Sequence, residues 1–200
     1  MSLRPAVRLS LAAVLVAACA DGTPPTDPSL RATAQAGAAK AAGASQVNQL
    51  LAATRAATAK YHDLDAALAD GYVPGSPCVS HPTLGAMGFH YVNPALIGDP
   101  SLDETRPEVL VYEPKANGGL KLVAVEYMVP AMGPRPSLFG QAFENGPPIP
   151  TPNGLVPTYA LHAWVWQPNP SGIFAAFNPS VSCENAPAPG AADVAAHAHH

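Results

Sequence analysis

Charged residues are scarce in this 200-residue chain, because Asp, Glu, Lys and Arg together make up only 12% of it. Globular domains usually carry about 25% of these residue types. The formal net charge is −4, and no run of Lys or Arg occurs after the first residues of the chain. Binding to the phosphates of nucleic acid requires clustered cations, so we expect no nucleic-acid partner.

The familiar catalytic motifs are also missing. The sequence contains no H-E-x-x-H, no G-x-S-x-G, no C-x-x-C and no C-x-x-C-H, which are typical of zinc peptidases, serine hydrolases, thiol oxidoreductases and haem proteins. Catalytic groups are defined by their geometry as well as by local motifs. These absences therefore argue against an enzyme and leave the question open.

Long apolar runs are missing after the N-terminal leader, so no segment reaches the roughly 18 residues of a membrane-spanning helix. The leader itself carries Arg4 and Arg8, followed by a nearly unbroken apolar stretch at residues 9–18. A short basic head before a short apolar core is typical of a secretory signal peptide.

The end of the leader reads Leu15-Val16-Ala17-Ala18-Cys19, which resembles the lipobox of bacterial lipoproteins. This resemblance implies cleavage before Cys19 and acylation of that cysteine, with an ordinary signal peptide as the alternative. Ala20 follows the cysteine, where an aspartate would resemble an inner-membrane retention signal. The resemblance thus implies anchoring by lipid to the outer membrane or the cell surface, outside the cytoplasm.

Composition divides the rest of the chain. Residues 1–18 are the predicted signal peptide. Residues 19–45, which are rich in Ala and Pro, are predicted to be a flexible tether with fluctuating helix in its Ala-rich half. A single globular domain is expected at residues 46–185. Residues 186–200 form a predicted disordered tail that ends in three histidines, His197, His199 and His200.

The expected fold class is α+β, with one long N-terminal helix packed on a small antiparallel sheet. Apolar residues recur at helical spacing from Val47 to Leu68, with Ser45 as the expected N-cap and Gly71 as the left-handed residue at the end. An Asn117-Gly118 pair between two β-rich runs predicts a hairpin. The expected strands are residues 88–93, 108–113, 120–129 and 159–166, and a fifth strand or a turn is expected at 173–177.

Proline interrupts the chain between the third and fourth of these strands. Residues 130–157 contain eight prolines, and proline cannot donate a hydrogen bond in a sheet. We therefore expect a long irregular loop here, of the kind that is usually functional or covers another part of the molecule.

Two cysteines remain once Cys19 is assigned to lipid. Cys78 and Cys183 form an even pair in an oxidising compartment, which predicts a disulfide. A metal site that uses Cys78 and His81 is the alternative. Structural zinc sites usually have two such close pairs, and this sequence has only one.

Several polar residues, among them His90, Glu126 and His162, fall within the predicted strands. Alternation places Glu126 on one face of its strand together with Leu120, Leu122, Ala124 and Met128. An unpaired charged carboxylate on an apolar face would be costly. We therefore propose that His90, Glu126 and His162 converge and bind zinc or another divalent transition metal. A structural hydrogen-bond network and an exposed Glu126 are the alternatives.

These observations predict an exported, lipid-anchored envelope protein whose domain binds a small ligand or a metal. A metal-dependent hydrolase that uses the same His/Glu site is one alternative. The other is a purely structural envelope module, in which the polar residues only satisfy one another.

Overall fold

The computed structural model describes residues 28–99 and 101–187. The leader, Cys19 and the three histidines of the tail lie outside the described residues. Contacts divide the chain into residues 1–40 and residues 41–200. In the first part, residues 31–40 are helical and exposed. No helix of the described residues is both long enough and apolar enough to cross a membrane.

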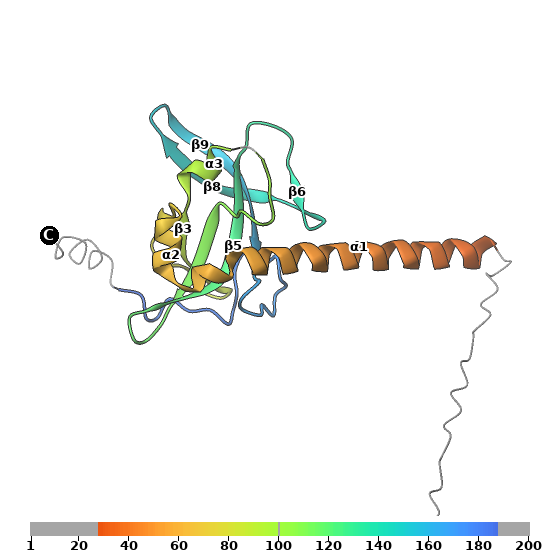
Figure 1. The fold of residues 1–200 in the computed structure, drawn as a ribbon, viewed down its shortest axis with the longest axis horizontal. Helices are drawn as coiled ribbons and strands as arrows, with labels where there is room; N and C mark the ends of the chain where they lie inside the picture. Colours follow the sequence, from red (N-terminus) through yellow and green to blue (C-terminus); the bar gives the residue numbers. More distant parts are fainter. Residues whose placement is uncertain (1–27, 100, 188–200) are drawn as a thin grey trace, which may run out of the picture. The chain divides into compact units, whose positions relative to one another are not determined.

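The fold combines helices with a curled antiparallel sheet, so the predicted α+β class is confirmed (Figure 1). The helices are α1 (Pro28–Thr58), the 3₁₀ helix η1 (Ala59–His62), α2 (Leu64–Ala69) and α3 (Pro94–Ile97). The strands are β1 (Val73–Pro74), β2 (Val79–His81), β3 (Gly85–Val92), β4 (Val109–Pro114), β5 (Leu120–Pro130), β6 (Ser137–Leu138), β7 (Gln141–Ala142), β8 (Glu144–Thr151) and β9 (Gly154–Ala163).

The helical segment differs from the prediction at both ends. α1 begins at Pro28, inside the predicted tether, and proline is favoured at a first helical turn. Ser45 therefore lies within α1 and does not cap it. The helix ends at Thr58, and Asp63 caps the separate helix α2 by accepting a hydrogen bond from the backbone N–H of Asp65. Gly71 follows α2 with φ 91°, as expected for a left-handed residue.

The main sheet has the order β1-β3-β4-β5-β9-β8, and β2 pairs with β3. The predicted hairpin is confirmed as β4 and β5, joined through Asn117 and Gly118. A bulge between Val111 and Tyr112 lets Tyr112 pair with Leu122. As a result, Leu122 and Leu120 pack in the helix-facing core and do not share a face with Glu126, contrary to the prediction.

The proline-rich segment is more regular than expected. β8 contains three prolines and pairs with β9, with a register shift between Gly146 and Ile149. β8 lies at the end of the strand order, and an edge strand tolerates proline because one of its sides needs no partner. Residues 173–177 form turns, the second of the two predicted alternatives.

The two faces of the sheet are covered differently. On one face, residues of the helices pack with β4, β5 and β9, including Leu51, Tyr61, Tyr112 and Tyr127. The hydroxyl of Tyr112 donates to the backbone carbonyl of Tyr61 at 2.7 Å. The opposite face carries two smaller apolar clusters, one around Val111, Ala124 and Trp164 and the other around Val109, Met128 and Ile97.

The predicted disulfide is present between Cys78 and Cys183, whose Cα atoms are 5.8 Å apart. It joins the segment before β2 to the last part of the described chain. Cys78 is thus paired with Cys183, and the alternative of a metal site with His81 does not describe this structure. The ring of His81 instead lies 5.4 Å from that of Phe177.

Candidate metal centre

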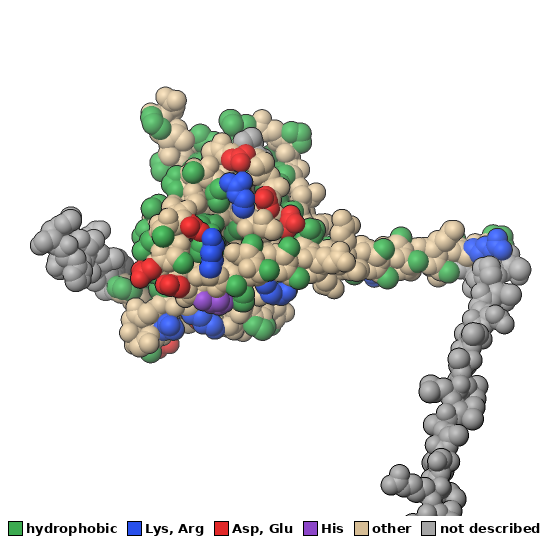
Figure 2. All heavy atoms as spheres, in the orientation of Figure 1, with side chains coloured by type: hydrophobic (Ala, Val, Ile, Leu, Met, Phe, Trp, Pro, Cys, Tyr) green, Lys and Arg blue, Asp and Glu red, His purple; other side chains and the backbone are tan. Residues whose placement is uncertain are grey.

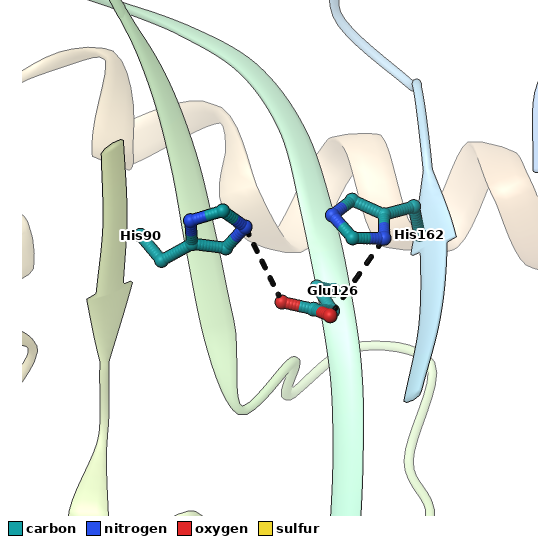
Figure 3. A group of neighbouring side chains, drawn as sticks. All are labelled: His90, Glu126 and His162. Atoms are coloured by element: carbon teal, nitrogen blue, oxygen red, sulfur yellow. Dashed lines mark ion pairs between the residues drawn. The ribbon is translucent and has the colours of Figure 1, made fainter. Parts of the chain in front are cut away.

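The three histidine and glutamate residues predicted from the sequence meet on one face of the sheet (Figure 3). His90 lies on β3, Glu126 on β5 and His162 on β9. Glu126 pairs directly with His162 across the ladder between β5 and β9. One potential ligand atom from each of the three residues can be chosen so that all lie within 4.8 Å of one another.

His90 reaches Glu126 across an intervening strand. It pairs with Val111 of β4, and Glu126 pairs with Val109 of the same strand. Neighbouring strands are about 4.8 Å apart, so the backbones of β3 and β5 are separated by roughly twice this spacing. The side chains of His90 and Glu126 span this gap and approach to 3.7 Å.

All three side chains are buried. The relative exposure of the side chain is 11% for His90, 2% for Glu126 and 7% for His162. Burial raises the pKa of the Glu126 carboxyl, and it lowers the pKa of His90. Burial lowers the pKa of His162 to about 4. Both imidazoles are therefore neutral at neutral pH, the form in which histidine binds a metal.

The distances within the cluster are too long for hydrogen bonds. His90 Nε2 lies 3.7 Å from Glu126 Oε2, and His162 Nδ1 lies 3.7 Å from Glu126 Oε1. Hydrogen bonds between nitrogen and oxygen are typically about 2.7–3.2 Å long. Two ligands that share one zinc ion at bond lengths of about 2.0–2.2 Å lie roughly 3–4 Å apart, so these separations suit shared coordination.

Two fully buried atoms of the cluster have no hydrogen-bond partner. Among the described residues, only Glu126 Oε2 and His162 Nε2 are buried side-chain atoms without one. Unsatisfied buried polar groups are rare and costly in native proteins. In Figure 3 one ring nitrogen of His162 points toward Glu126 and the other toward His90. The polar atoms of the cluster thus face one another, as the ligands of a single ion would.

The neighbours of the cluster hold the histidine rings in place. Trp164 stacks on His162 with an interplanar angle of 16°. Nδ1 of His90 lies 2.9 Å from the hydroxyl oxygen of Ser76. Ser76 was not predicted from the sequence, because it lies in a short segment without a motif.

A separate cavity of about 1040 Å³ lies near one end of the sheet. It is lined mainly by apolar residues, among them Val92, Ile97, Met132 and Ile149, and none of its lining residues is charged. The three site residues do not line it. The candidate metal centre and the cavity are therefore distinct features of the domain.

Charges of both signs lie on the visible face of the described residues. Figure 2 shows acidic and basic side chains interspersed over the visible side of the described residues. The paired charges include Lys60 with Asp70 and Lys121 with Glu113.

No protein-family model, curated protein or solved structure matches this chain. The class to which it belongs is therefore defined by its own features. It is a mixed helix and sheet protein with a curled antiparallel sheet, one disulfide and a buried cluster of two histidines and one glutamate.

Proposed function

We propose that this chain is an exported, lipid-anchored protein whose domain binds one divalent transition-metal ion through His90, Glu126 and His162. The observation that carries the proposal is the buried carboxylate of Glu126. Its Oε2 has no hydrogen-bond partner and lies 3.7 Å from Nε2 of a neutral histidine. A cation between these atoms would satisfy both of them at once.

The donor set favours zinc or a similar borderline ion. Two imidazoles and one carboxylate are the protein ligands of several zinc sites, and harder ions such as Mg²⁺ and Ca²⁺ prefer oxygen ligands. A bound divalent ion would also stabilise the ionised form of Glu126, against the effect of burial.

Metal binding is favoured over hydrolysis because of burial. Three protein ligands leave a coordination position free, as in catalytic zinc sites. A substrate must nevertheless reach the ion, and no side chain of the cluster is more than 11% exposed. The proposal therefore assigns the ion a resident role, which holds β3, β5 and β9 together, and assigns it no catalysis.

The test is the metal content of the full chain in which His197, His199 and His200 are replaced by alanine, so that the tail contributes no ligand. After exposure to zinc and dialysis, we expect one ion per chain by elemental analysis. The Glu126→Gln and His162→Ala variants are expected to lose it. The controls are His62→Ala and His81→Ala, which change the two exposed histidines of the described residues and should retain the ion.

Two results would overturn the proposal. One is a folded parent protein that retains no zinc, copper or manganese when each is offered. The other is an ion that persists in both Glu126→Gln and His162→Ala. In either case the cluster is part of the packing of the sheet and has no role as a metal centre.

Lipid anchoring is proposed from the leader and needs a separate test. Labelled palmitate supplied to cells that express the full chain should be incorporated into the parent protein. The Cys19→Ser variant should not incorporate it and should leave the membrane fraction. Incorporation of label into Cys19→Ser would contradict the assignment of that cysteine.

A further inference from the structure

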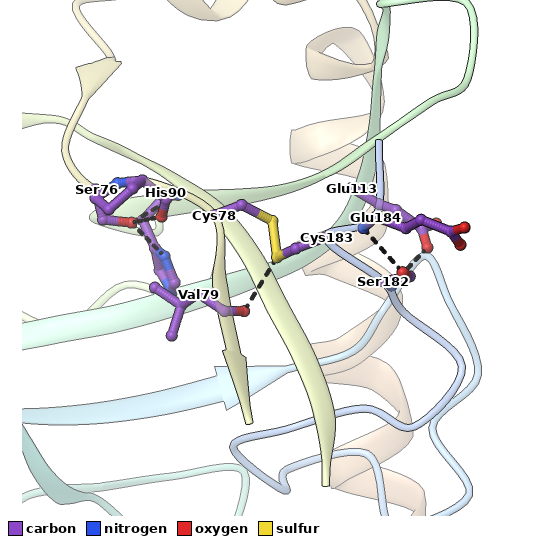
Figure 4. The surroundings of a disulfide bond; sticks show 9 residues. Ser76, Cys78, Val79, His90, Glu113, Ser182, Cys183 and Glu184 are labelled. Carbon is purple, nitrogen blue, oxygen red and sulfur yellow. Dashed lines mark hydrogen bonds between the residues drawn. A yellow bond between two sulfur atoms is a disulfide. The ribbon is translucent and has the colours of Figure 1, made fainter. Parts of the chain in front are cut away.

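Ser76 lies in the segment between β1 and β2 and contacts the backbone and the ring of His90 (Figure 4). Its hydroxyl oxygen is 2.9 Å from His90 Nδ1 and accepts the backbone N–H of His90 at 3.4 Å. The preceding residue, Gly75, donates its backbone N–H to the carbonyl of His90 at 2.8 Å. Hydrogen bonds to the backbone of His90 therefore fix the position of Ser76 relative to the imidazole.

The single proton of the Ser76 hydroxyl has an acceptor other than His90. Ser76 Oγ donates to the backbone carbonyl of Pro77 at 2.8 Å. A hydroxyl has one proton and two lone pairs, so an oxygen that donates to Pro77 can only accept from His90 Nδ1. A neutral imidazole carries one N–H. With that proton on Nδ1, the Nε2 atom presents a lone pair toward Glu126.

The environment of Glu126 agrees with this assignment. If Nε2 carried the proton, the carboxylate oxygen opposite it would be a strong acceptor, and such bonds are about 2.7–2.9 Å long. The Nε2–Oε2 separation is instead 3.7 Å, and Oε2 has no partner. Neither atom donates a hydrogen bond to the other across this gap, which leaves both available to a shared cation.

We propose that Ser76 is a positioning residue that holds His90 in the form protonated on Nδ1, so that its Nε2 is available to bind the metal. The inference rests on the proposed function for what Nε2 binds. The protonated nitrogen of His90, however, is a property of the metal-free protein and can be measured there. In metal sites, the partner of the second histidine nitrogen commonly sets which nitrogen ligates.

The disulfide restrains the backbone next to Pro77, whose carbonyl accepts the hydrogen bond from Ser76. Cys78 follows Pro77 directly, is bonded to Cys183, and precedes the strand β2 that pairs with β3. In Figure 4 Cys78 lies between the Ser76–His90 pair and Cys183. The carbonyl that accepts the Ser76 proton is therefore held close to a covalent cross-link, which keeps this acceptor available to Ser76.

The experiment compares the full chain, with its three tail histidines replaced by alanine, with its Ser76→Ala and Ser76→Thr variants. Long-range nitrogen–proton correlation spectra of the metal-free proteins at neutral pH report which ring nitrogen carries the proton. We expect Nδ1–H for His90 in the parent and in Ser76→Thr, which keeps a hydroxyl. In Ser76→Ala we expect a large population of the Nε2–H form.

Zinc affinity is then measured by competition with a chelator. Ser76→Ala should bind about 10–100-fold more weakly than the parent, the usual effect of removing a group that orients a ligand. Ser76→Thr should recover most of this loss. Ser80→Ala, which changes an exposed serine of the adjacent strand β2, is the matched control and should match the parent.

The outcomes separate the two proposals. An Nε2–H form of His90 in the parent, or an unchanged Nδ1–H form in Ser76→Ala, would overturn the role of Ser76. If the parent shows the Nδ1–H form, loses it in Ser76→Ala and binds no zinc, the role of Ser76 in orienting His90 is supported. That result overturns only the proposal of a metal centre.

Discussion

The indole ring of Trp164 lies nearly parallel to the imidazole ring of His162, with 6.2 Å between the ring centroids. The other tryptophan of the chain, Trp166, contacts the exposed His62 at 4.4 Å. The protein thus has one tryptophan beside the candidate metal centre and one beside a histidine outside it. This arrangement provides an optical test of metal binding.

Cu(II) or Co(II) bound at the centre is expected to quench most of the emission of Trp164, because these ions are efficient quenchers at short range. A Trp166→Phe variant, which keeps only Trp164, should be strongly quenched by a stoichiometric amount of metal. A Trp164→Phe variant should be quenched much less. Equal quenching of the two variants, measured by fluorescence titration, would show that the ion binds elsewhere.

The stability of the metal-free protein distinguishes a metal centre from a structural network. Glu126→Gln removes a buried carboxylate that has an unsatisfied oxygen, and we expect the free energy of unfolding without metal to rise by about 1 kcal/mol or more. A satisfied network would give the opposite sign, a loss of about 1–3 kcal/mol. Denaturant unfolding in the presence of a chelator measures the difference.

Gly88 lies two residues before His90 on β3, so a change in the backbone at Gly88 would displace His90. It has φ 115°, and a Cβ at this position would lie 2.4 Å from the carbonyl oxygen of Tyr112. Gly88→Ala should therefore destabilise the domain by more than about 1 kcal/mol and weaken zinc binding. Gly133→Ala, where a Cβ meets nothing within 4 Å, is the control. Comparable thermal unfolding of the two variants would contradict this prediction.

The disulfide closes a long loop, with a sequence separation of 105 between Cys78 and Cys183. Replacing both cysteines by serine should lower the free energy of unfolding by about 4–5 kcal/mol, because the unfolded chain gains conformational freedom. Denaturant titrations measure this loss. Addition of a reducing agent should destabilise the parent by a similar amount and leave the double variant unchanged.

Glu108 makes the free energy of unfolding of the domain depend on pH. Its side chain is buried, and burial raises its pKa from 4.5 to about 7. The folded state therefore binds this proton more tightly than the unfolded state does. The resulting stability is fully present below pH 4.5 and is lost as the pH rises through about 7.

Glu108→Gln should remove this dependence. The amide oxygen of glutamine can still accept the backbone N–H of Met128, which Glu108 Oε2 accepts at 3.1 Å. Relative to the variant, the parent should lose about 3 kcal/mol of unfolding free energy as the pH rises through this range. Parallel pH profiles of the two proteins in denaturant titrations would contradict the prediction.

The parts of the fold that follow from local rules were predictable from the sequence. The hairpin of β4 and β5 is signalled by the Asn117-Gly118 pair between two β-rich runs. The disulfide is signalled by the two cysteines that remain once Cys19 is assigned to lipid. The start of α1 was not predictable in the same way, because an Ala-rich segment is compatible with both a tether and a helix. β8 was missed because prolines are incompatible with central strands, and only the strand order shows that it lies at an edge.

The residues of the candidate site could be predicted from the sequence, but their convergence on one face of the sheet could not. The apolar surroundings of Glu126 indicated that it needs a partner, and both histidines lie in strong strand patterns. Their convergence depends on the order β3-β4-β5-β9, which pairs residues far apart in the sequence. The bulge beside Tyr112 and the contact of Ser76 with His90 likewise depend on tertiary packing, so no local pattern signals them.

All the strands that carry the candidate site lie between Cys78 and Cys183. The backbone between these cysteines and the disulfide together form a closed covalent ring. One proteolytic cut within the ring, for instance in the exposed stretch at residues 132–135, opens the chain without releasing a fragment. After such a cut, His90, Glu126 and His162 would remain in one covalently connected molecule.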